Sequence, residues 1–400
     1  MTSSIHIHRT IEPFITEVNP LFLFNKDESK SLSPSLLKIK KELKKQIKKP
    51  SPLPTLTPTE RKLVKEINEQ TNTLNKNNIT RTKAYLDFYQ QHPEVHWSFM
   101  AHMVSRNGGY NMTDLKGGFL NKLMTLKERK SFFEFLERSN WLIFQDAFPQ
   151  LLLYKESLHR SQNLFHLLPH LHVSIFMKTI WNHFWKQGDS ALLTIALVIN
   201  EQSYLESRVV QNPVYKDNVL SSLEFKLQDL LSMNHILFPY LIDHNTKLIG
   251  DTVHHFENLH ERILIGKRLY KILFGDQQRL KQIVSWAVKH PHTGSRMDYW
   301  PQLFHYVDEG VPALHLTPRI VACKLTPGSP RIYSPKLELT WKDQTHEEAE
   351  IADWFNDWKV IHYLKDENLN VNGEIQSEYC RTLATLELAA IATKPISVFD

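Results

Sequence analysis

Glycine is scarce in this chain, and this scarcity limits the available folds more than any other feature of the sequence. Only 12 of the 400 residues are glycine. Tight turns and phosphate-binding loops depend on glycine, because it reaches positive φ angles without a steric cost. Turn-dense β-sandwiches and glycine-rich nucleotide-binding folds are therefore disfavoured. Since 42% of the residues are hydrophobic, the chain can still build a substantial core, and we predict a predominantly α-helical protein.

Helical patterns run through most of the chain after residue 57. Thr57-Pro58-Thr59-Glu60 is a strong helix start, with a capping threonine, a proline at the first helical position and a glutamate three residues after the cap. A similar start at Thr345 predicts a helix that carries Trp354 and Trp358. The other predicted helices are Thr80–Gln91, Glu94–Asn107, Leu126–Phe135, Pro169–Lys186, Ala191–Val210, Val219–Leu231, Leu248–Phe274, Gln277–Lys289 and Glu374–Thr393. The start of Ala191–Val210 is apolar on nearly every side, as expected of a central buried helix.

One short stretch has the alternating pattern of strands. Arg319–Leu325 and Lys336–Trp341 alternate apolar and polar residues around a Thr-Pro-Gly-Ser-Pro turn. The predicted fold is therefore a large multi-helix domain with a small β-hairpin near the C-terminal end.

The first 56 residues are expected to form a flexible basic arm and a proline-rich linker, and residues 57–400 a single helical domain. The net charge of +5 comes from this arm, because residues 26–49 hold nine lysines and three acids. These lysines are Lys26, Lys30, Lys38, Lys40, Lys41, Lys44, Lys45, Lys48 and Lys49. The arm could contact an anionic surface, of nucleic acid or membrane. Alternatively, Leu36, Ile39 and Leu43 pack the arm loosely on the body. The rest of the chain is close to neutral, so it gives no general argument for nucleic-acid binding.

The compartment expected from the sequence is the cytoplasm. Two cysteines, Cys323 and Cys380, imply no disulfide framework and fit a reduced setting. The N-terminus lacks the charged and apolar regions of a signal peptide. The most apolar run, Ala191–Ile199, is shorter than the roughly 20 residues that cross a bilayer.

The densest group of polar residues follows Pro93. His102 and Arg106 lie one helical turn apart, and the Asn107-Gly108-Gly109 sequence is typical of a helix end. Asn111, Thr113 and Asp114 would then follow in a loop. Such a loop could present Arg106 and backbone N–H groups to an anionic ligand. The alternative is a structural corner in which these residues bind one another.

A second candidate loop is His-Pro-His-Thr-Gly-Ser-Arg-Met-Asp at residues 290–298. Arg296 could bind a phosphate or carboxylate there, and Asp298 lies two residues further on. An ordinary helix C-terminus anchored by Tyr299 and Trp300 is the alternative, because loops naturally collect these residue types.

The segment HWSFMAHMVSRNGGYNMTDLKG, residues 96–117, resembles the signature of the YppC-like family of Bacillus-type bacteria, the domain of unknown function DUF2515. Later stretches, such as RSNWLIFQDAFPQLLLY at 138–154 and HPHTGSRMDYWPQLF at 290–304, are similar to the same family. The resemblance runs from about Thr80 to beyond Trp341 and leaves out the lysine-rich arm. It implies one continuous family domain and no established activity.

Two Glu-x-x-His pairs place a carboxylate beside an imidazole on one helical face. They are Glu156 with His159 and Glu257 with His260, and Glu201 could supply a further ligand. Helical di-metal sites that hold Fe, Mn or Zn use this geometry. Composition alone predicts about as many such pairs as occur, so ordinary core histidines are the alternative.

Three functions remain from the sequence. The first is a cytoplasmic helical protein that binds a partner or small ligand without established catalysis. The second is a metal-dependent enzyme, which requires Glu201, Glu257 and His260 to converge. The third is a peripheral nucleic-acid or membrane-surface binder that acts through the lysine-rich arm.

Overall fold

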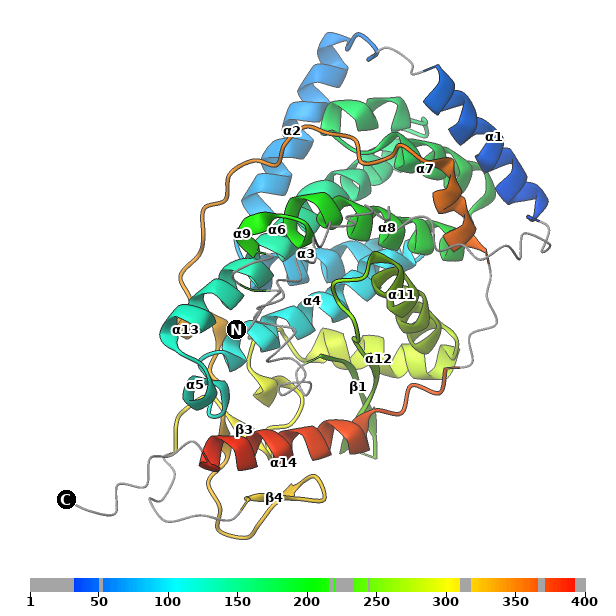
Figure 1. Ribbon diagram of the computed structural model, residues 1–400. Coiled ribbons are helices and arrows are strands. Elements are labelled where there is room, and N and C mark those ends of the chain that lie inside the picture. Colours follow the sequence, from blue (N-terminus) through cyan, green and yellow to red (C-terminus); the bar gives the residue numbers. More distant parts are fainter. Residues whose placement is uncertain are drawn as a thin grey trace, which may run out of the picture.

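The chain folds into a mostly helical protein (Figure 1). The computed structural model describes residues 32–49, 53–215, 219, 234–243, 245–309, 318–365 and 371–392. The first half contains α1 (Pro34–Lys48), α2 (Pro58–Leu74), α3 (Asn78–Gln91), α4 (His96–Asp114), α5 (Leu120–Leu123), α6 (Leu126–His159), the 3-10 helix η2 (Phe165–Leu171), α7 (Ile175–Gln187), α8 (Ser190–Leu205), the π-helical η3 (Glu206–Val210) and α9 (Pro213–Tyr215). The second half contains β1 (His235–Ile242), β2 (Asn245–Thr252), α11 (Leu259–Phe274), α12 (Gln277–Lys289), η6 (Arg296–Asp298), β3 (Phe304–His305), β4 (Ile320–Val321), β5 (Lys324–Leu325), β6 (Ile332–Tyr333), α13 (Leu337–Thr340), η7 (Trp358–Leu364) and α14 (Gln376–Ala392).

The helix start at Thr57 is confirmed. The Thr57 backbone N–H donates to the Glu60 carboxylate at 2.9 Å, and the Glu60 N–H donates to Oγ1 of Thr57 at 3.2 Å. Helix α6 begins with the same motif at Thr125, but it runs to His159 rather than ending at Phe135. The prediction ended it too early because Glu137 interrupts the apolar pattern, although its side chain is buried inside the protein.

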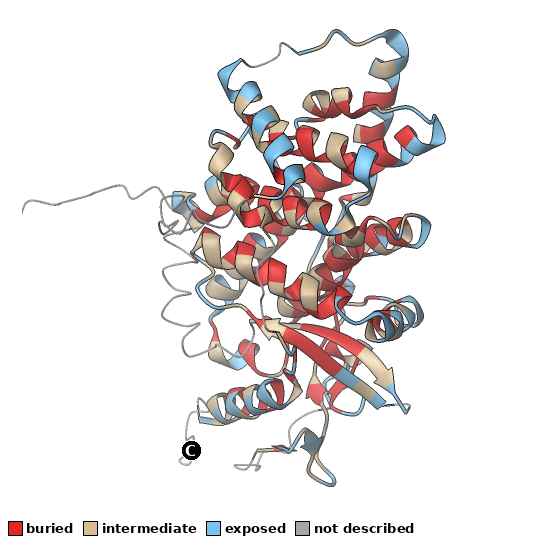
Figure 2. Cartoon of the chain, turned by 90° about the vertical axis from the view of Figure 1, so that its right-hand side faces the viewer, coloured by how far each residue is buried: buried red, intermediate tan, exposed pale blue. Residues whose placement is uncertain are grey.

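Helix α8 is at the centre of the core, as its sequence predicted. Leu193, Ala196, Leu197 and Ile199 are at most 1% exposed. The helix packs against α4, α6, α7 and α11. Figure 2 shows buried residues running through this layer of helices and along the hairpin below it.

Helix α1, which lies in the described part of the lysine-rich arm, packs on the body against α7 and η7. Its apolar residues Leu36, Ile39 and Leu43 are buried. Lys40 and Lys44 place their ammonium groups over the ring of Trp358, 4.4 and 4.0 Å from its centroid. Cation–π contacts of this kind add to the apolar packing.

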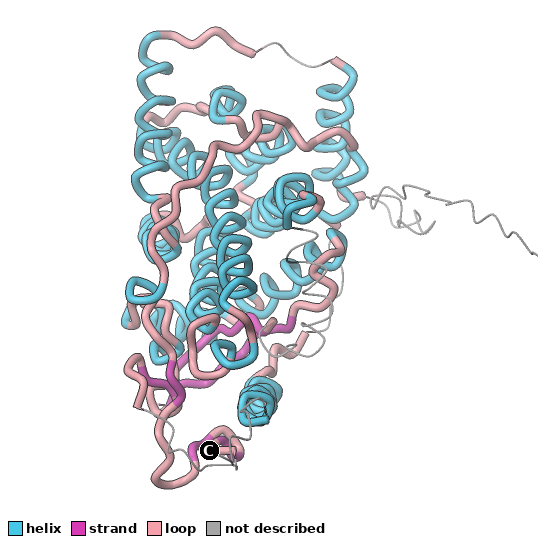
Figure 3. The backbone as a smooth tube through the Cα atoms, turned by 60° about the vertical axis from the view of Figure 1, so that its left-hand side comes forward, coloured by secondary structure: helices cyan, strands magenta, loops and turns pink. Residues whose placement is uncertain are grey.

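A hairpin of two eight-residue strands, β1 and β2, lies near one end of the molecule beneath the helices (Figure 3). The strands pair antiparallel from His235 with Thr252 to Ile242 with Asn245. The prediction of one helix from Leu248 to Phe274 is therefore wrong over its first part. Backbone pairing with β1 holds residues 248–252 extended, and α11 begins only where the Asn258 side chain accepts from the His260 and Glu261 N–H groups.

The small hairpin predicted at residues 319–341 does not form as expected. The short strands β4 and β5 pair with each other, whereas β6 pairs in parallel with β3. The predicted second strand is instead the single helical turn α13, followed by Trp341. The alternating pattern was misleading there because Leu337 is buried while Leu339 is 71% exposed.

The helix predicted after Thr345 is also absent, since residues 341–357 have no regular structure before η7. This segment runs along the helices, in orange in Figure 1, from α13 to η7 beside α1. Arg208 binds the carbonyl oxygens of Glu350 and Ala352, at 3.0 and 2.8 Å, and the Ile175 N–H donates to Asp353. These contacts with other helices replace the hydrogen bonds that a local helix would make.

Two further predicted helices, Pro169–Lys186 and Val219–Leu231, are not found as single described helices. The helix expected over Pro169–Lys186 is divided into η2 and α7, because His172 adopts a left-handed conformation with φ 60° between them. The helix expected over Val219–Leu231 lies outside the described residues except for Val219.

Cys323 and Cys380 form a disulfide, with their Cα atoms 5.3 Å apart. The expectation that two cysteines imply no disulfide is wrong for this pair. The bond joins the β4–β5 turn to α14, two segments 57 residues apart in the chain. The number of cysteines did not reveal that Cys323 and Cys380 lie close together, because their distance depends on the tertiary fold.

None of the helices in the described residues combines the length and the apolar character that a membrane span requires.

Candidate functional site

The two polar clusters predicted on separate segments meet in the structure. We call this group the polar corner, and it contains His102, Arg106, Asn107, Asn111, Asp114, Arg296 and Asp298. The first five lie on α4, and the last two lie in η6. Helix α4 continues through both glycines to Asp114, so the predicted helix end after Asn107 is wrong.

Gly109 is needed for close packing rather than for a helix cap. A Cβ atom there would lie 2.3 Å from both Oδ1 of Asn78 and Nε2 of His292. These two atoms are themselves 2.9 Å apart and hydrogen-bonded. The glycine therefore lets α3 and the segment after α12 close over α4.

Arg296 is fully enclosed by partners in the polar corner. Its Nε donates to Asp114 at 2.7 Å, and its Nη2 donates to Asn111 at 3.2 Å. Its Nη1 donates to the hydroxyls of Tyr299 and Tyr379, at 2.8 and 2.9 Å. Burial raises the pKa of Asp114 more than the charge of Arg296 lowers it.

Arg106 lies over the ring of Trp286, 4.6 Å from its centroid. Its Nη1 donates to the His290 carbonyl at 2.7 Å, and its Nη2 lies 3.5 Å from the Asp298 carboxylate. Its Nε donates to the Tyr110 hydroxyl at 3.2 Å. Both arginines of the polar corner thus bind protein groups, although Nη2 of Arg106 has no hydrogen bond to the described residues.

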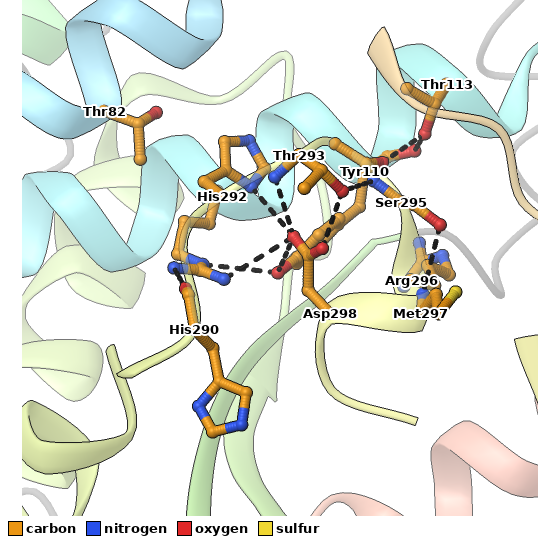
Figure 4. A network of polar contacts seen from close by, with 12 residues as sticks. Thr82, Tyr110, Thr113, His290, His292, Thr293, Ser295, Arg296, Met297 and Asp298 are labelled. Atoms are coloured by element: carbon orange, nitrogen blue, oxygen red, sulfur yellow. Dashed lines mark hydrogen bonds and ion pairs between the residues drawn. The ribbon is translucent and has the colours of Figure 1, made fainter. Parts of the chain in front are cut away.

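Asp298 collects contacts from several directions (Figure 4). The Thr293 backbone N–H and hydroxyl donate to its two oxygens at 2.9 and 2.6 Å, and Nδ1 of His292 is 3.5 Å away. Burial would raise the pKa of Asp298, but His292 and Arg106 outweigh it and lower the pKa below its usual value. Burial lowers the pKa of His292 to about 4, so this imidazole is neutral near pH 7.

The remaining two members connect the polar corner to neighbouring elements. Asn107 accepts from the Leu237 N–H at 2.9 Å and donates to the Leu237 carbonyl at 3.0 Å, which attaches β1 to α4. Nδ1 of His102 donates to the Thr82 carbonyl at 2.8 Å. The seven predicted residues lie on α4 and η6, and their contacts with one another and with Thr82 and Leu237 join α3, α4, β1 and η6.

The candidate metal ligands are not brought together. Glu156 and His159 lie at the end of α6, and Glu201 lies in α8. Glu257 lies just before α11, and His260 lies in its first turn. Glu201 accepts from Nε1 of Trp97 at 3.2 Å, and Nδ1 of His260 lies 3.1 Å from the Tyr363 hydroxyl. Throughout the described ranges, no three His, Cys, Asp or Glu side chains are grouped so as to hold a metal ion.

A cavity of about 420 Å³ lies at a place that the sequence did not indicate. We call it the Glu137 pocket. The connection from α2 to α3 lines one side, with Lys76, Asn77 and Ile79. Phe133 and Glu137 of α6 line a second side, and residues of segment 337–344 complete it.

Glu137 forms a buried ion pair beside this pocket. Nη2 of Arg81 donates to its Oε2 at 2.6 Å, and the two side chains are 1% and 4% exposed. Its Oε1 lies 3.6 Å from Nε2 of His346, beyond hydrogen-bond range. Considering only the described part of the chain, Oε1 of Glu137, Nε of Arg81 and Nε2 of His346 have no hydrogen-bond partner.

The Glu137 side chain is ionised at neutral pH. Burial alone would raise its pKa, but the charge of Arg81 and the nearby His346 outweigh burial and lower it. A buried charged acceptor without a hydrogen bond costs about 1–3 kcal/mol or more. Few buried polar groups in proteins are left in this state, and bound water or a ligand commonly accounts for them.

The polar corner supports one wall of the Glu137 pocket. The Leu337 N–H donates to the Thr293 carbonyl at 2.9 Å, and Nε1 of Trp341 donates to the Met112 carbonyl at 2.8 Å. Phe133 and Lys116 lie against the Trp341 ring, each about 4.1 Å from its centroid. Neighbours of the polar corner in the chain, Met112 on α4 and Thr293 before η6, therefore position the segment that lines the pocket.

One sequence signal could have revealed Glu137. It lies four residues after Phe133 and four before Trp141, so a continued helix places it among residues that face the core. A glutamate in an apolar stripe needs a buried partner. That partner, Arg81, comes from a helix 56 residues earlier and could not be identified from spacing.

Two other acids are the buried Asp146 on α6 and the half-buried Glu201 on α8, and among the described residues both accept hydrogen bonds only from neutral groups. Asp146 accepts from Gln150 and Asn200, and burial raises its pKa to about 7. Burial likewise raises the pKa of Glu201 to about 7. Both acids are therefore partly protonated near neutral pH.

Comparison with known proteins gives a family and no function. Residues 73–380 match the family described as "Protein of unknown function (DUF2515)". The "Uncharacterized protein YppC" of Bacillus subtilis (strain 168) is 42% identical over 238 residues, which cover 60% of this chain and 73% of that protein. No solved structure matches the chain. The matched range includes the whole Glu137 pocket and the polar corner. The chain belongs to the DUF2515 family of proteins of unknown function.

Proposed function

We propose that this protein binds a small molecule in the Glu137 pocket. One observation carries the proposal: a cavity of about 420 Å³ lies beside the buried carboxylate of Glu137, whose Oε1 has no hydrogen bond to any residue that the structure describes. Small-molecule sites are usually cavities of about 300–1,000 Å³ with mostly apolar walls and a few fixed polar groups. Phe133, Ile79, Leu337 and Trp341 supply the apolar part of the wall here. The other seven lining residues, Glu137 among them, are polar or charged, so this pocket is more polar than most.

The polar corner is less favourable as a ligand site. The donors of Arg296 are directed at Asp114, Asn111 and two tyrosine hydroxyls. A ligand would have to displace these buried partners, which costs more than filling an existing cavity. We therefore assign the polar corner a supporting role in binding.

The test is a fragment screen of the full chain followed by NMR of its tryptophan indole N–H groups. The Trp341→Phe variant assigns the Trp341 signal. Trp286, whose ring lies under Arg106 of the polar corner, is the internal reference. We expect binding fragments to shift the Trp341 signal and leave the Trp286 signal unchanged. A Gln344→Trp variant, changed at the exposed rim, fills the pocket and is expected to abolish the shift. If no fragment moves the Trp341 signal, the proposal is wrong.

A second candidate function rests on the outward face of α1. Because Leu36, Ile39 and Leu43 are buried against the body, the exposed side of the helix consists largely of lysines. Lys38, Lys41, Lys45, Lys48 and Lys49 are exposed. We propose that this face contacts a phosphate-rich surface by electrostatic attraction, without inserting apolar residues into it.

This second proposal predicts salt-dependent binding to anionic vesicles or to duplex DNA. Changing Lys38, Lys41, Lys45 and Lys48 to glutamine keeps the buried face of α1 and removes the charge. We expect the variant to lose most binding, and the intact protein to bind more weakly as salt increases. Equal binding by both proteins would show that α1 is not the contact.

A further inference from the structure

The polar groups around the Glu137 pocket indicate which kind of molecule fits it. We propose that the ligand is a small organic cation, an amine, amidine or guanidine, whose N–H groups bind Oε1 of Glu137 and whose flat or apolar body lies against Phe133 and Leu337. This inference rests on the proposed function, because it concerns the same pocket. It adds the charge and hydrogen-bonding character of the ligand.

The first argument comes from hydrogen bonding. An ionised carboxylate only accepts hydrogen bonds, and one of the two Glu137 oxygens is already used by Arg81. The other oxygen requires a donor, and bonds between a cation and a carboxylate are about twice as strong as neutral ones. A ligand carboxylate or phosphate at this position would instead meet the negative charge of Glu137.

The second argument comes from the charges around the cavity. Three carboxylates line it, those of Glu137, Glu338 and Asp343, against two ammonium groups. Lys76 lies 3.2 Å from Asp343, so one of these ammonium groups is already paired. Arg81, which pairs with Glu137 at 2.6 Å, balances the third carboxylate, so no excess of positive charge opposes a cation at Oε1 of Glu137.

The third argument concerns shape. The Trp341 ring is stacked on Phe133, with an angle of 4° between the planes, and Lys116 covers Trp341 as well. The pocket therefore meets a rigid apolar wall that does not need to be ordered on binding. A flat ligand loses little by binding to such a preformed wall.

The experiment uses three probes with the same aromatic body and different head groups. Benzamidine is a cation with N–H donors, benzamide is a neutral N–H donor, and benzoate is an anion. Titration calorimetry with the full chain measures their affinities, and the Trp341 indole signal shows whether they bind in the pocket. We expect benzamidine to bind about tenfold or more tightly than benzamide, and benzoate to bind most weakly.

Two variants test the role of charge. Glu137→Gln removes the negative charge and is expected to abolish the preference for benzamidine. Glu134→Gln makes the same chemical change at an exposed position on the same helix and should leave the preference unchanged. Because Glu137→Gln also disturbs Arg81, Glu338→Lys at the exposed rim is a second test. It should weaken benzamidine by about two- to fivefold and strengthen benzoate.

The outcomes separate this inference from the proposed function. If benzoate shifts the Trp341 signal and binds as tightly as benzamidine, the pocket is a ligand site but the cation assignment is wrong. If Glu137→Gln folds and keeps the preference for benzamidine, the assignment to Glu137 is wrong. If neither these probes nor any screened fragment moves the Trp341 signal, the proposed function fails, and this inference fails with it.

Discussion

The polar corner and the Glu137 pocket are each built around a buried arginine–carboxylate pair, and they differ in what surrounds the pair. Arg296 binds Asp114 at 2.7 Å, and Arg81 binds Glu137 at 2.6 Å. The other donors of Arg296 reach Asn111 and two tyrosine hydroxyls. In the second pair, Oε1 of Glu137 and Nε of Arg81 have no hydrogen bond to any described residue.

This difference separates a structural ion pair from a candidate binding site. A dense group of polar residues can satisfy itself, and it then stabilises the fold without leaving capacity for a ligand. A free acceptor beside a cavity has that capacity. The density of His, Arg, Asn and Asp in the sequence indicated the polar corner. Among the described residues, Nη2 of Arg106 and Nε2 of His102 in that corner also lack a hydrogen bond, so it is the cavity beside Glu137 that favours the pocket.

The largest expected effect is the loss of Arg296 from the polar corner. Arg296→Met leaves the Asp114 carboxylate and two tyrosine hydroxyls buried without their donor, so we expect about 3–5 kcal/mol less stability. Urea unfolding measures the change. Arg331→Met is the matched control, because its ion pair with Glu309 is 35% and 29% exposed and should contribute less than about 1 kcal/mol. Equal losses in the two variants would contradict a structural role for the polar corner.

The next effect is a dependence of stability on pH that arises at His292, whose Nδ1 lies 3.5 Å from Asp298 of the polar corner. The folded-state pKa of His292, about 4, is below the ordinary value of 6.5, so the unfolded chain binds more protons between these values. The contribution of His292 to stability is therefore present above pH 6.5 and is lost as the pH falls towards 4. The expected loss is on the order of 3 kcal/mol.

The raised pKa values of Asp146 on α6 and Glu201 on α8 make stability depend on pH in the opposite direction. The pKa of Asp146, raised to about 7, favours the protonated folded state, so stability from this group is lost as the pH rises from about 4 to 7. Unfolding free energies of the intact chain, His292→Gln and Asp146→Asn between pH 4 and 8 separate the two contributions. If His292→Gln retains the full decrease at low pH, the decrease does not come from His292.

A smaller effect distinguishes the two adjacent glycines of α4. Gly109→Ala drives a methyl group into the hydrogen bond between Asn78 and His292, and we expect it to cost about 1–3 kcal/mol. At Gly108 the nearest atom to an added Cβ is Nδ2 of Asn140, 3.3 Å away. Gly108→Ala should be neutral or slightly stabilising, because alanine favours a helix. Thermal unfolding compares them, and equal stability would show that close packing does not require Gly109.

Local signals in the sequence were sufficient for part of the fold. Thr57, Pro58 and Glu60 marked the start of α2, and the predicted helix Gln277–Lys289 has the bounds of α12. Residues 248–252 were misassigned because their strand depends on pairing with β1. The disulfide was missed for the same kind of reason, since it joins distant segments.

The candidate site was predictable only in part. The polar corner could be anticipated as two groups of polar residues, whereas their meeting depends on how α4 and η6 pack. The Glu137 pocket is formed by residues 76–79, 133–137 and 337–344, three separate segments. Taken alone, the first and last contain ordinary surface charges and helix-end residues, and the second shows only a glutamate in an apolar stripe, so none by itself indicates a pocket.

Hydrogen–deuterium exchange of the full chain, with and without a saturating probe that binds it, tests the central claim most directly. If the Glu137 pocket is the binding site and the polar corner is its support, exchange will slow at residues 76–81 and 337–346. The amides of residues 102–108 and 296–298 will be unchanged. Protection confined to residues 102–114 and 290–298 would place the ligand in the polar corner and contradict the account.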